Sequence, residues 1–168
     1  MIRKSTPIIL EEYDARWARE FEALREKIAG ALGEVAAAIE HVGSTSVPGL
    51  AAKPIIDLDV LLRTEDEIPL AIERLAAIGY QHQGDLGVSG REAFRAPGSG
   101  FPHHLYVCSP EQFRRHVAFR DFLRTHPEDA QAYARLKREL AREFADDRDA
   151  YTRGKSEFVE EILGRARP

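Results

Sequence analysis

Residues 41–60 read HVGSTSVPGLAAKPIIDLDV and contain the most informative pattern in the chain. The apolar residues that lead into it predict a strand over 35–42, which ends in a turn of small residues. Pro54 to Leu62 is an apolar run interrupted only by two aspartates, a composition typical of a strand buried on both faces. We therefore expect two strands, the second of them buried, with the turn of small residues following the first.

Asp57 and Asp59 are the unusual residues of the second strand. Residues two apart on a strand point to the same face, so the two carboxylates should lie side by side. Two neighbouring anions repel each other unless a cation shares them. Mg²⁺ and Mn²⁺ prefer carboxylate and phosphate oxygens, which makes this pair a candidate metal site. The alternative is an ion pair, or a solvated face of an edge strand.

The turn between the strands is a candidate phosphate site. Gly43, Ser44, Thr45 and Ser46 can present backbone N–H groups and hydroxyls to an anion. The same residue types also make ordinary loops. Lys53 follows the turn and either reaches a phosphate or neutralises the aspartates. An anion site beside two carboxylates points to phosphoryl or nucleotidyl transfer.

The rest of the chain predicts a mixed α/β unit followed by helices. The sequence is 168 residues long, and we expect a single domain over 1–168, with an α/β core over 1–108 and helices over 109–168 packed on it. Helices are expected over 14–32 and 64–78, from Ser109 to about Arg124, from Pro127, and from Asp147 or Asp149 almost to the C-terminus. Further strands are expected within 80–94 and over 103–108.

Composition excludes several classes of protein. The net charge of −4 is not that of a general nucleic-acid binder, and a single cysteine, Cys108, rules out an internal disulfide. Neither an apolar leader nor a membrane-spanning run is present in the sequence, so we expect a cytoplasmic protein that does not enter a membrane. Cys108 is most simply a small core residue.

Three cations in the C-terminal half interrupt apolar helix faces. On one helix Tyr151, Lys155 and Phe158 would share a stripe, and a lysine within such a stripe usually meets an anion. Arg148 lies on a similar face, and Arg120 falls in the apolar sector of its own helix. We expect these cations to contact a phosphate-bearing ligand, or else to form internal salt bridges or reach water.

The pattern Gly-Ser followed by Asp-Leu-Asp-Val resembles the signature of the polymerase-beta-like nucleotidyltransferases. The longer strings HVGSTSVPGL and KPIIDLDV, with HHLYV at 103–107, FRDFLR at 119–124 and DRDAY at 147–151, resemble the GrpB family, a branch of that superfamily. The resemblance covers nearly the whole chain. It implies a nucleotidyltransferase-like fold, a mixed sheet flanked by helices with a C-terminal helical run. Some family members are fused to dephospho-CoA kinase, which implies a functional link to that enzyme.

The chain departs from the superfamily at one position. Active members usually place a third carboxylate on the strand that faces the two aspartates, where this chain has His104 and Tyr106. GrpB members commonly carry His-x-His there. His104 could complete the metal sphere or act as a base. Two carboxylates and a histidine suit Mn²⁺ or Zn²⁺ better than three carboxylates would.

Three functions fit these features. The first is a divalent-metal-dependent nucleotidyltransferase that uses a nucleoside triphosphate and an unknown acceptor. Asp57, Asp59 and His104 would be its catalytic and metal-binding residues, while Gly43, Ser44, Lys155 and the other cations would hold phosphates. The second is a non-catalytic module that binds a nucleotide or a CoA-like ligand and docks to a partner enzyme. The third is a metal-dependent hydrolase.

Overall fold

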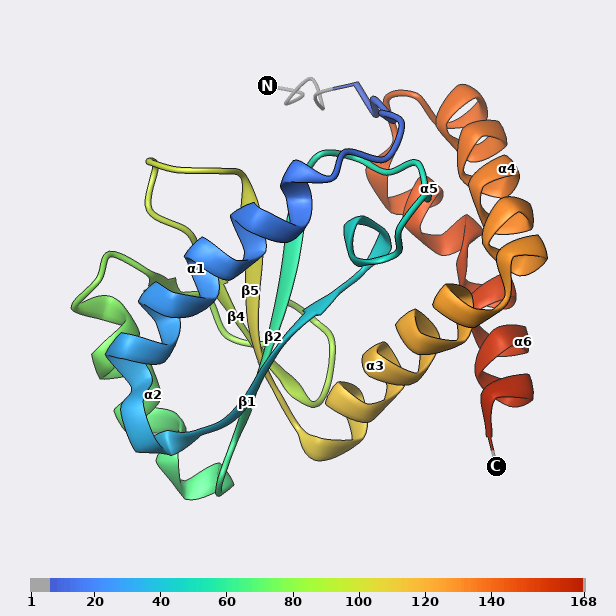
Figure 1. Cartoon of the computed structure of the whole chain (residues 1–168). Helices are drawn as coiled ribbons and strands as arrows, with labels where there is room; N and C mark the ends of the chain where they lie inside the picture. The colour runs from blue at the N-terminus through green and yellow to red at the C-terminus, as the bar shows by residue number, and fades with distance from the viewer. Residues whose placement is uncertain (1–6, 168) are drawn as a thin grey trace.

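The computed structural model describes residues 7–167, and its centre is a five-stranded mixed sheet in the order β1–β2–β5–β4–β3 (Figure 1). The strands are β1 (Ala36–Val42), β2 (Ile56–Leu62), β3 (Gln81–His82), β4 (Arg91–Arg95) and β5 (His103–Cys108). β2 is antiparallel to β1 and parallel to β5. The run from Pro54 to Leu62 is therefore a central strand, as its apolar composition predicts.

Helices cover both faces of the sheet. They are α1 (Arg16–Leu32), α2 (Ile68–Ala76), α3 (Pro110–Thr125), α4 (Pro127–Glu143), α5 (Arg148–Gly154) and α6 (Ser156–Ala166), with short 3₁₀ turns η1 (Gly33–Val35), η2 (Ser44–Ser46) and η3 (Glu65–Glu67). Figure 1 shows α1 and α2 on one side of the sheet and α3 to α6 on the other. This arrangement confirms the expected mixed sheet flanked by helices, with a C-terminal helical run.

The main hydrophobic core lies between α1, α2 and the sheet. It contains Trp17, Phe21, Leu24, Ile28 and Leu32 of α1, Ala71 and Leu75 of α2, and Ile56, Leu58, Val60, Leu105 and Val107 of the sheet. Alternate residues of β2 thus fill this core, which turns Asp57 and Asp59 towards the opposite face, the face that α3 crosses.

Helix ends follow the predicted capping residues. Thr64 and Glu67 form the expected capping box, and the hydroxyl of Ser109 accepts a hydrogen bond from the backbone N–H of Gln112. The expected last helix is divided, because α5 ends at Gly154 and α6 begins at Ser156. A side chain at position 154 would place its Cβ 2.5 Å from the Leu140 Cδ2 atom, so α5 lies unusually close to α4.

Among the helices of the described residues, none is both long and apolar enough to cross a membrane.

Candidate functional site

The turn after β1 lies directly against Asp57. Gly43 has a φ of +73°, and a Cβ built there would lie 2.3 Å from the Asp57 Oδ2 atom. A glycine is therefore required twice, once for its backbone conformation and once for the close approach of the carboxylate. The pairing of Val42 with Asp57 across β1 and β2 creates this approach. The predicted phosphate-binding turn therefore lies in close contact with Asp57, the first predicted metal ligand.

Buried hydrogen bonds fix the shape of the turn. Ser46 donates from its hydroxyl to the Gly43 carbonyl, and the Thr45 hydroxyl hydrogen-bonds the Nε2 atom of His41 at 2.8 Å. The His41 ring stacks on Phe21. Burial lowers the pKa of His41 to about 4, despite the opposing charge of Asp57. His41 is therefore neutral at ordinary pH and positions the turn as a structural support.

Asp57 pairs with the predicted histidine of the neighbouring strand. β2 and β5 are in register so that Asp57 lies beside His104, whose Nδ1 atom is 2.9 Å from Asp57 Oδ1. Both side chains are partly exposed. This carboxylate and imidazole can reach a ligand from solvent, and they are the types of donor that bind Mn²⁺, Mg²⁺ or Zn²⁺.

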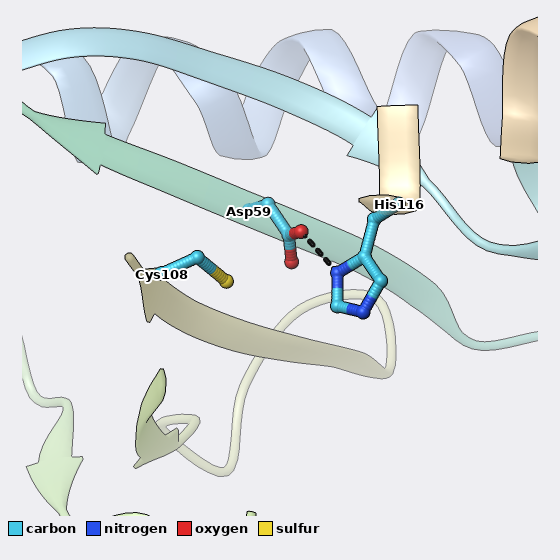
Figure 2. Close-up of side chains that lie close together, drawn as sticks. All are labelled: Asp59, Cys108 and His116. Atoms are coloured by element: carbon cyan, nitrogen blue, oxygen red, sulfur yellow. Dashed lines mark hydrogen bonds and ion pairs between the residues drawn. The ribbon is translucent and has the colours of Figure 1, made fainter. Parts of the chain in front are cut away.

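Asp59 has a different environment, although it lies on the same face of β2. Its side chain is 0% exposed, and its Oδ2 atom accepts a hydrogen bond of 2.5 Å from Nδ1 of His116 on α3. Figure 2 shows these two side chains converging with that of Cys108, from the end of β5. Burial first, and then the charge of Asp59, holds the pKa of Cys108 well above its usual range.

A cavity of about 280 Å³ opens beside Asp57 and joins the sheet to the C-terminal helices. Lys53 follows the turn, while Lys137 comes from α4 and Lys155 from the junction of α5 and α6. The other lining residues are Gly43, Ser44, Thr45, Ala52, Ile55, Asp57, His104, Tyr106, Phe119, Tyr133, Tyr151 and Thr152. Three lysines thus face a cavity whose lining contains one carboxylate, so the cavity is electropositive.

The lysines are largely desolvated. Burial first, and then the charges of neighbouring lysines, lower the pKa of Lys137 to about 7 and that of Lys155 to about 8. The pKa of Lys53 is lowered as well, chiefly by burial. Lys137 is only 2% exposed and donates to the Ala51 carbonyl. Buried cations that repel one another are stabilised when an anion joins them.

The ammonium groups of these lysines make cation–π contacts with tyrosine rings. The Nζ atoms of Lys53 and Lys155 lie 5.3 and 4.6 Å from the ring centre of Tyr151, and Lys137 Nζ lies 4.8 Å from that of Tyr133. Such contacts offset part of the cost of burial. All three lysines line the cavity, so a ligand bound there would lie next to them.

Most of the predicted site residues meet in the cavity, and some do not. Gly43, Ser44, Thr45, Lys53, Asp57, His104, Tyr151 and Lys155 line it, whereas Ser46, Asp59, Arg120 and Arg148 are not among its lining residues. Ser46 turns inward to close the turn. Arg120 donates to Glu40, to Asp121 and to the His41 carbonyl, which is the internal salt bridge considered as its alternative. Arg148 lies on the surface at the start of α5.

Lys137 and His116 are among the residues of these sites that the sequence did not predict. Lys137 shares a buried stripe of α4 with Tyr133 and Leu140. The same signal, a lysine within an apolar stripe, did identify Lys155. His116 carries no comparable signal, because its role depends on the docking of α3 over β2.

A second cavity of about 340 Å³ lies at the other end of the sheet. It is lined by charged residues of both signs, among them Arg63, Glu65, Arg91 and Glu92, and Cys108 borders it. It shares no lining residue with the cavity beside Asp57. Despite its larger volume, we assign the candidate site to the smaller cavity, because the turn, the carboxylate and the three lysines converge there.

The family model described as GrpB protein matches residues 7–165. The chain is 44% identical to the UPF0157 protein PA4798 of Pseudomonas aeruginosa over 160 residues, and 37% identical to the UPF0157 protein YqkA of Bacillus subtilis over 160 residues. These alignments cover 91% and 94% of this chain, but only 65% and 46% of the two relatives. The chain thus spans about half to two thirds of their lengths.

Solved structures show the same fold. A crystal structure of the conserved protein GrpB from Enterococcus faecalis superimposes with a TM-score of 0.84 and 36% identity, covering 94% of this chain and 96% of that one. Cid1, described as having RNA terminal uridylyl transferase activity, gives a TM-score of 0.54 with 17% identity over 78% of this chain and 43% of Cid1. At that identity the likeness shows a shared nucleotidyltransferase-like fold.

One more distant relative concerns the expected partner. A dephospho-CoA kinase of Mycolicibacterium paratuberculosis is 24% identical over 161 residues, which cover 79% of this chain and 39% of the kinase.

Proposed function

The chain belongs to the GrpB family, and on that premise we propose that it is a nucleotidyltransferase dependent on a divalent metal ion. It would transfer a nucleotidyl group from a nucleoside triphosphate to an acceptor, which is a small molecule or RNA. The nucleotidyltransferase-like fold supports this proposal, although a fold alone does not define an activity.

The observation that carries the proposal is the convergence of Asp57 with Lys53, Lys137 and Lys155 around one cavity. A triphosphate carries several negative charges on adjacent groups, and three desolvated lysines on three segments can neutralise them at once. Gly43 and Ser44 line the same cavity from the turn. The Ser44 hydroxyl can donate to a phosphate oxygen, while Gly43 leaves room for the ligand near the carboxylate.

Two of the three predicted metal ligands are placed so that they could bind the metal ion that such a reaction uses. Asp57 and His104 would hold it, and Mg²⁺ or Mn²⁺ bound there would supply charge neutralisation on the phosphates. Asp59, predicted as the second carboxylate, lies beneath α3 with its Oδ2 atom bonded to His116. We therefore assign the cavity-facing position to Asp57 and His104, a pair that favours Mn²⁺ more than a set of carboxylates would.

The remaining lining residues would position the nucleotide. Tyr106 and Phe119 lie on the sheet side and on α3, and Tyr133 lies on α4. Their rings offer an apolar wall to a planar base. In the alternative arrangement, in which Asp57 alone holds the metal ion, His104 would instead accept the proton of the attacking hydroxyl.

The proposal is tested first by binding. Thermal unfolding is measured with ATP, GTP, CTP and UTP, each with Mg²⁺ or Mn²⁺, and at least one triphosphate should raise Tm. Lys137→Met should remove most of that increase. Arg138→Met is the matched control, since Arg138 is the next residue of α4 but pairs with Glu12 at the surface. The proposed site is contradicted if no triphosphate raises the Tm of the parent protein. It is also contradicted if a triphosphate raises the Tm of the parent and of Lys137→Met equally.

Turnover is tested next, by pyrophosphate release in the presence of RNA and small-molecule acceptors. Release should require the metal ion and should disappear in Asp57→Asn. Triphosphate hydrolysis without an acceptor would instead identify the metal-dependent hydrolase.

A second candidate is a binding module without catalysis. It is favoured by the enclosure of Asp59, which leaves a single carboxylate at the cavity. Its ligand would be a nucleotide or a CoA-like molecule, and the relative named dephospho-CoA kinase supplies the class of partner enzyme. This function predicts an increase in Tm with the ligand and no turnover with any metal ion.

A further inference from the structure

Asp59, Cys108 and His116 form a cluster of their own on the face of the sheet beneath α3. Each offers one atom that can bind a metal ion, and these atoms all lie within 4.8 Å of one another. Figure 2 shows the three side chains pointing to a common centre, from β2, from β5 and from α3. Register explains the meeting, because β2 and β5 run parallel and Asp59, opposite Tyr106, is a diagonal neighbour of Cys108.

One atom of this cluster is left unsatisfied. Within the described part of the chain, Asp59 Oδ1 is fully buried and accepts no hydrogen bond. The other oxygen, Oδ2, is bonded to His116. The group that faces Oδ1 is the Cys108 thiol, which is a weak donor. A buried carboxylate oxygen that faces only a weak donor is poorly satisfied, and a bound cation would satisfy it.

We propose that Asp59, Cys108 and His116 bind a Zn²⁺ ion, at a metal site distinct from the Asp57 cavity. A carboxylate oxygen, an imidazole nitrogen and a thiolate sulfur together favour a borderline-soft cation over Mg²⁺. Binding replaces the thiol proton, which leaves for solvent, and the ion takes its fourth ligand from water. Asp59 and Cys108 are buried, while His116 is 38% exposed and Cys108 borders the cavity of about 340 Å³. The ion therefore has a route into an otherwise enclosed site.

The ion would fasten α3 to the sheet. His116 lies one turn before Phe119, which lines the cavity beside Asp57. A metal held by β2, β5 and α3 fixes the position of that wall. The site depends only on this cluster, so it stands whether or not the chain transfers nucleotides.

Cobalt is the probe for the test. The purified protein, freed of metal with a chelator and kept reduced, is titrated with Co²⁺ under anaerobic conditions. One equivalent should produce a sulfur-to-cobalt charge-transfer band in the near ultraviolet and the intense visible bands of a four-coordinate ion. Zn²⁺ should abolish both sets of bands and raise Tm.

Variants separate this site from others. Cys108→Ser should remove the charge-transfer band, and His116→Gln should weaken Zn²⁺ binding at least tenfold, while circular dichroism of the metal-free variants shows that they remain folded. His104→Gln and Asp57→Asn are the controls, and both should keep the band and the affinity. The proposal is overturned if Co²⁺ gives no sulfur band, or if Cys108→Ser and His116→Gln bind Zn²⁺ as tightly as the parent.

The two proposals fail separately. If both proposals are right, Asp57→Asn loses pyrophosphate release but gives the same cobalt spectrum as the parent protein. An absent cobalt band overturns only the zinc site, because the triphosphate assays do not use Cys108.

Discussion

Asp57 and Asp59 stand two residues apart on one face of β2, yet Asp57 lines an open cavity and Asp59 is enclosed beneath α3. Each carboxylate meets a histidine, His104 for the first and His116 for the second. The first pair is partly exposed and faces lysines, whereas in the second pair the carboxylate is fully buried beside a thiol. Strand periodicity sets the face on which an acid lies, but the helix that covers it decides what the acid can bind.

The largest difference is expected in turnover. Asp57→Asn should reduce pyrophosphate release at least ~100-fold, because it removes the only carboxylate among the lining residues of the cavity. Asp59→Asn should keep turnover within roughly tenfold and act mainly on stability, since its side chain does not reach the ligand. Equal losses in the two variants, measured in the same assay, would show that both acids serve the reaction.

The turn against Asp57 should be nearly as sensitive. Gly43→Ala forces a side chain into a φ of +73° and brings its Cβ to 2.3 Å from Asp57 Oδ2, so we expect a loss of about 3 kcal/mol in the free energy of unfolding. Gly49→Ala is the matched control. It has a φ of +82° but no atom within 4 Å of the added Cβ, and it should cost about 1 kcal/mol. Denaturant unfolding measures both, and equal costs would mean that the contact with Asp57 is unimportant.

The two histidines should differ in their contribution to the free energy of unfolding. His116→Ala leaves a fully buried carboxylate without its hydrogen bond and should destabilise the metal-free protein by about 2 kcal/mol. His104→Ala breaks a partly exposed pair and should cost less than about 0.5 kcal/mol. Urea unfolding of the two variants measures these losses. A larger loss of stability in His104→Ala than in His116→Ala would contradict the assignment of the Asp59–His116 pair as the buried one.

Lys137 should contribute to triphosphate binding while lowering the stability of the unliganded protein. Lys137→Met removes a desolvated cation and should leave the unliganded protein unchanged or more stable by about 1 kcal/mol. It should weaken triphosphate binding roughly tenfold, since a charged hydrogen bond to phosphate is lost. Calorimetric titration with the stabilising triphosphate measures the affinity. Strong destabilisation with unchanged affinity would make Lys137 a structural residue.

The smallest effect is a pH dependence. The pKa values of Lys137 and Lys155 are about 7 and about 8 without ligand, so triphosphate affinity should fall as pH rises from 7 to 9 and these lysines lose their protons. Stability has the opposite sign. The unfolded lysines keep their protons up to a pKa of 10.5, so between pH 7 and 10 the unfolded state binds more protons and the free energy of unfolding rises with pH.

This rise should be smaller in Lys137→Met, which unfolding at several pH values would reveal. An affinity that does not change between pH 7 and 9 would exclude the lysines from the phosphate site.

The sequence was sufficient for the strands and for much of the cavity. The apolar run from Pro54 to Leu62 predicted a buried strand with two acids on one face, and the Gly43 turn does lie beside Asp57. The stripe that contains Lys155 predicted a buried cation, and Lys155 does line the cavity. These features depend on residues near one another in the chain, where periodicity is informative.

The remaining features depend on contacts between distant segments. His116 meets Asp59 across 57 positions, and Arg120 finds Glu40 across 80, so neither partner could be read from a local pattern. Helix spacing places Arg120 in an apolar sector but does not say which acid lies above it. The division between α5 and α6 at Lys155 also went unpredicted, because the sequence there contains no proline.

Gly154 carries a final consequence for the cavity. Because it has no side chain, α5 lies against Leu140, which is one turn beyond Lys137, while Lys155 follows the glycine directly. A residue outside the lining of the cavity therefore helps to set the separation of the Lys137 and Lys155 ammonium groups. Under the proposed function, a larger residue at position 154 would change the spacing of these two ammonium groups, and with it the preference of the cavity among phosphate-bearing ligands, without changing a lining residue.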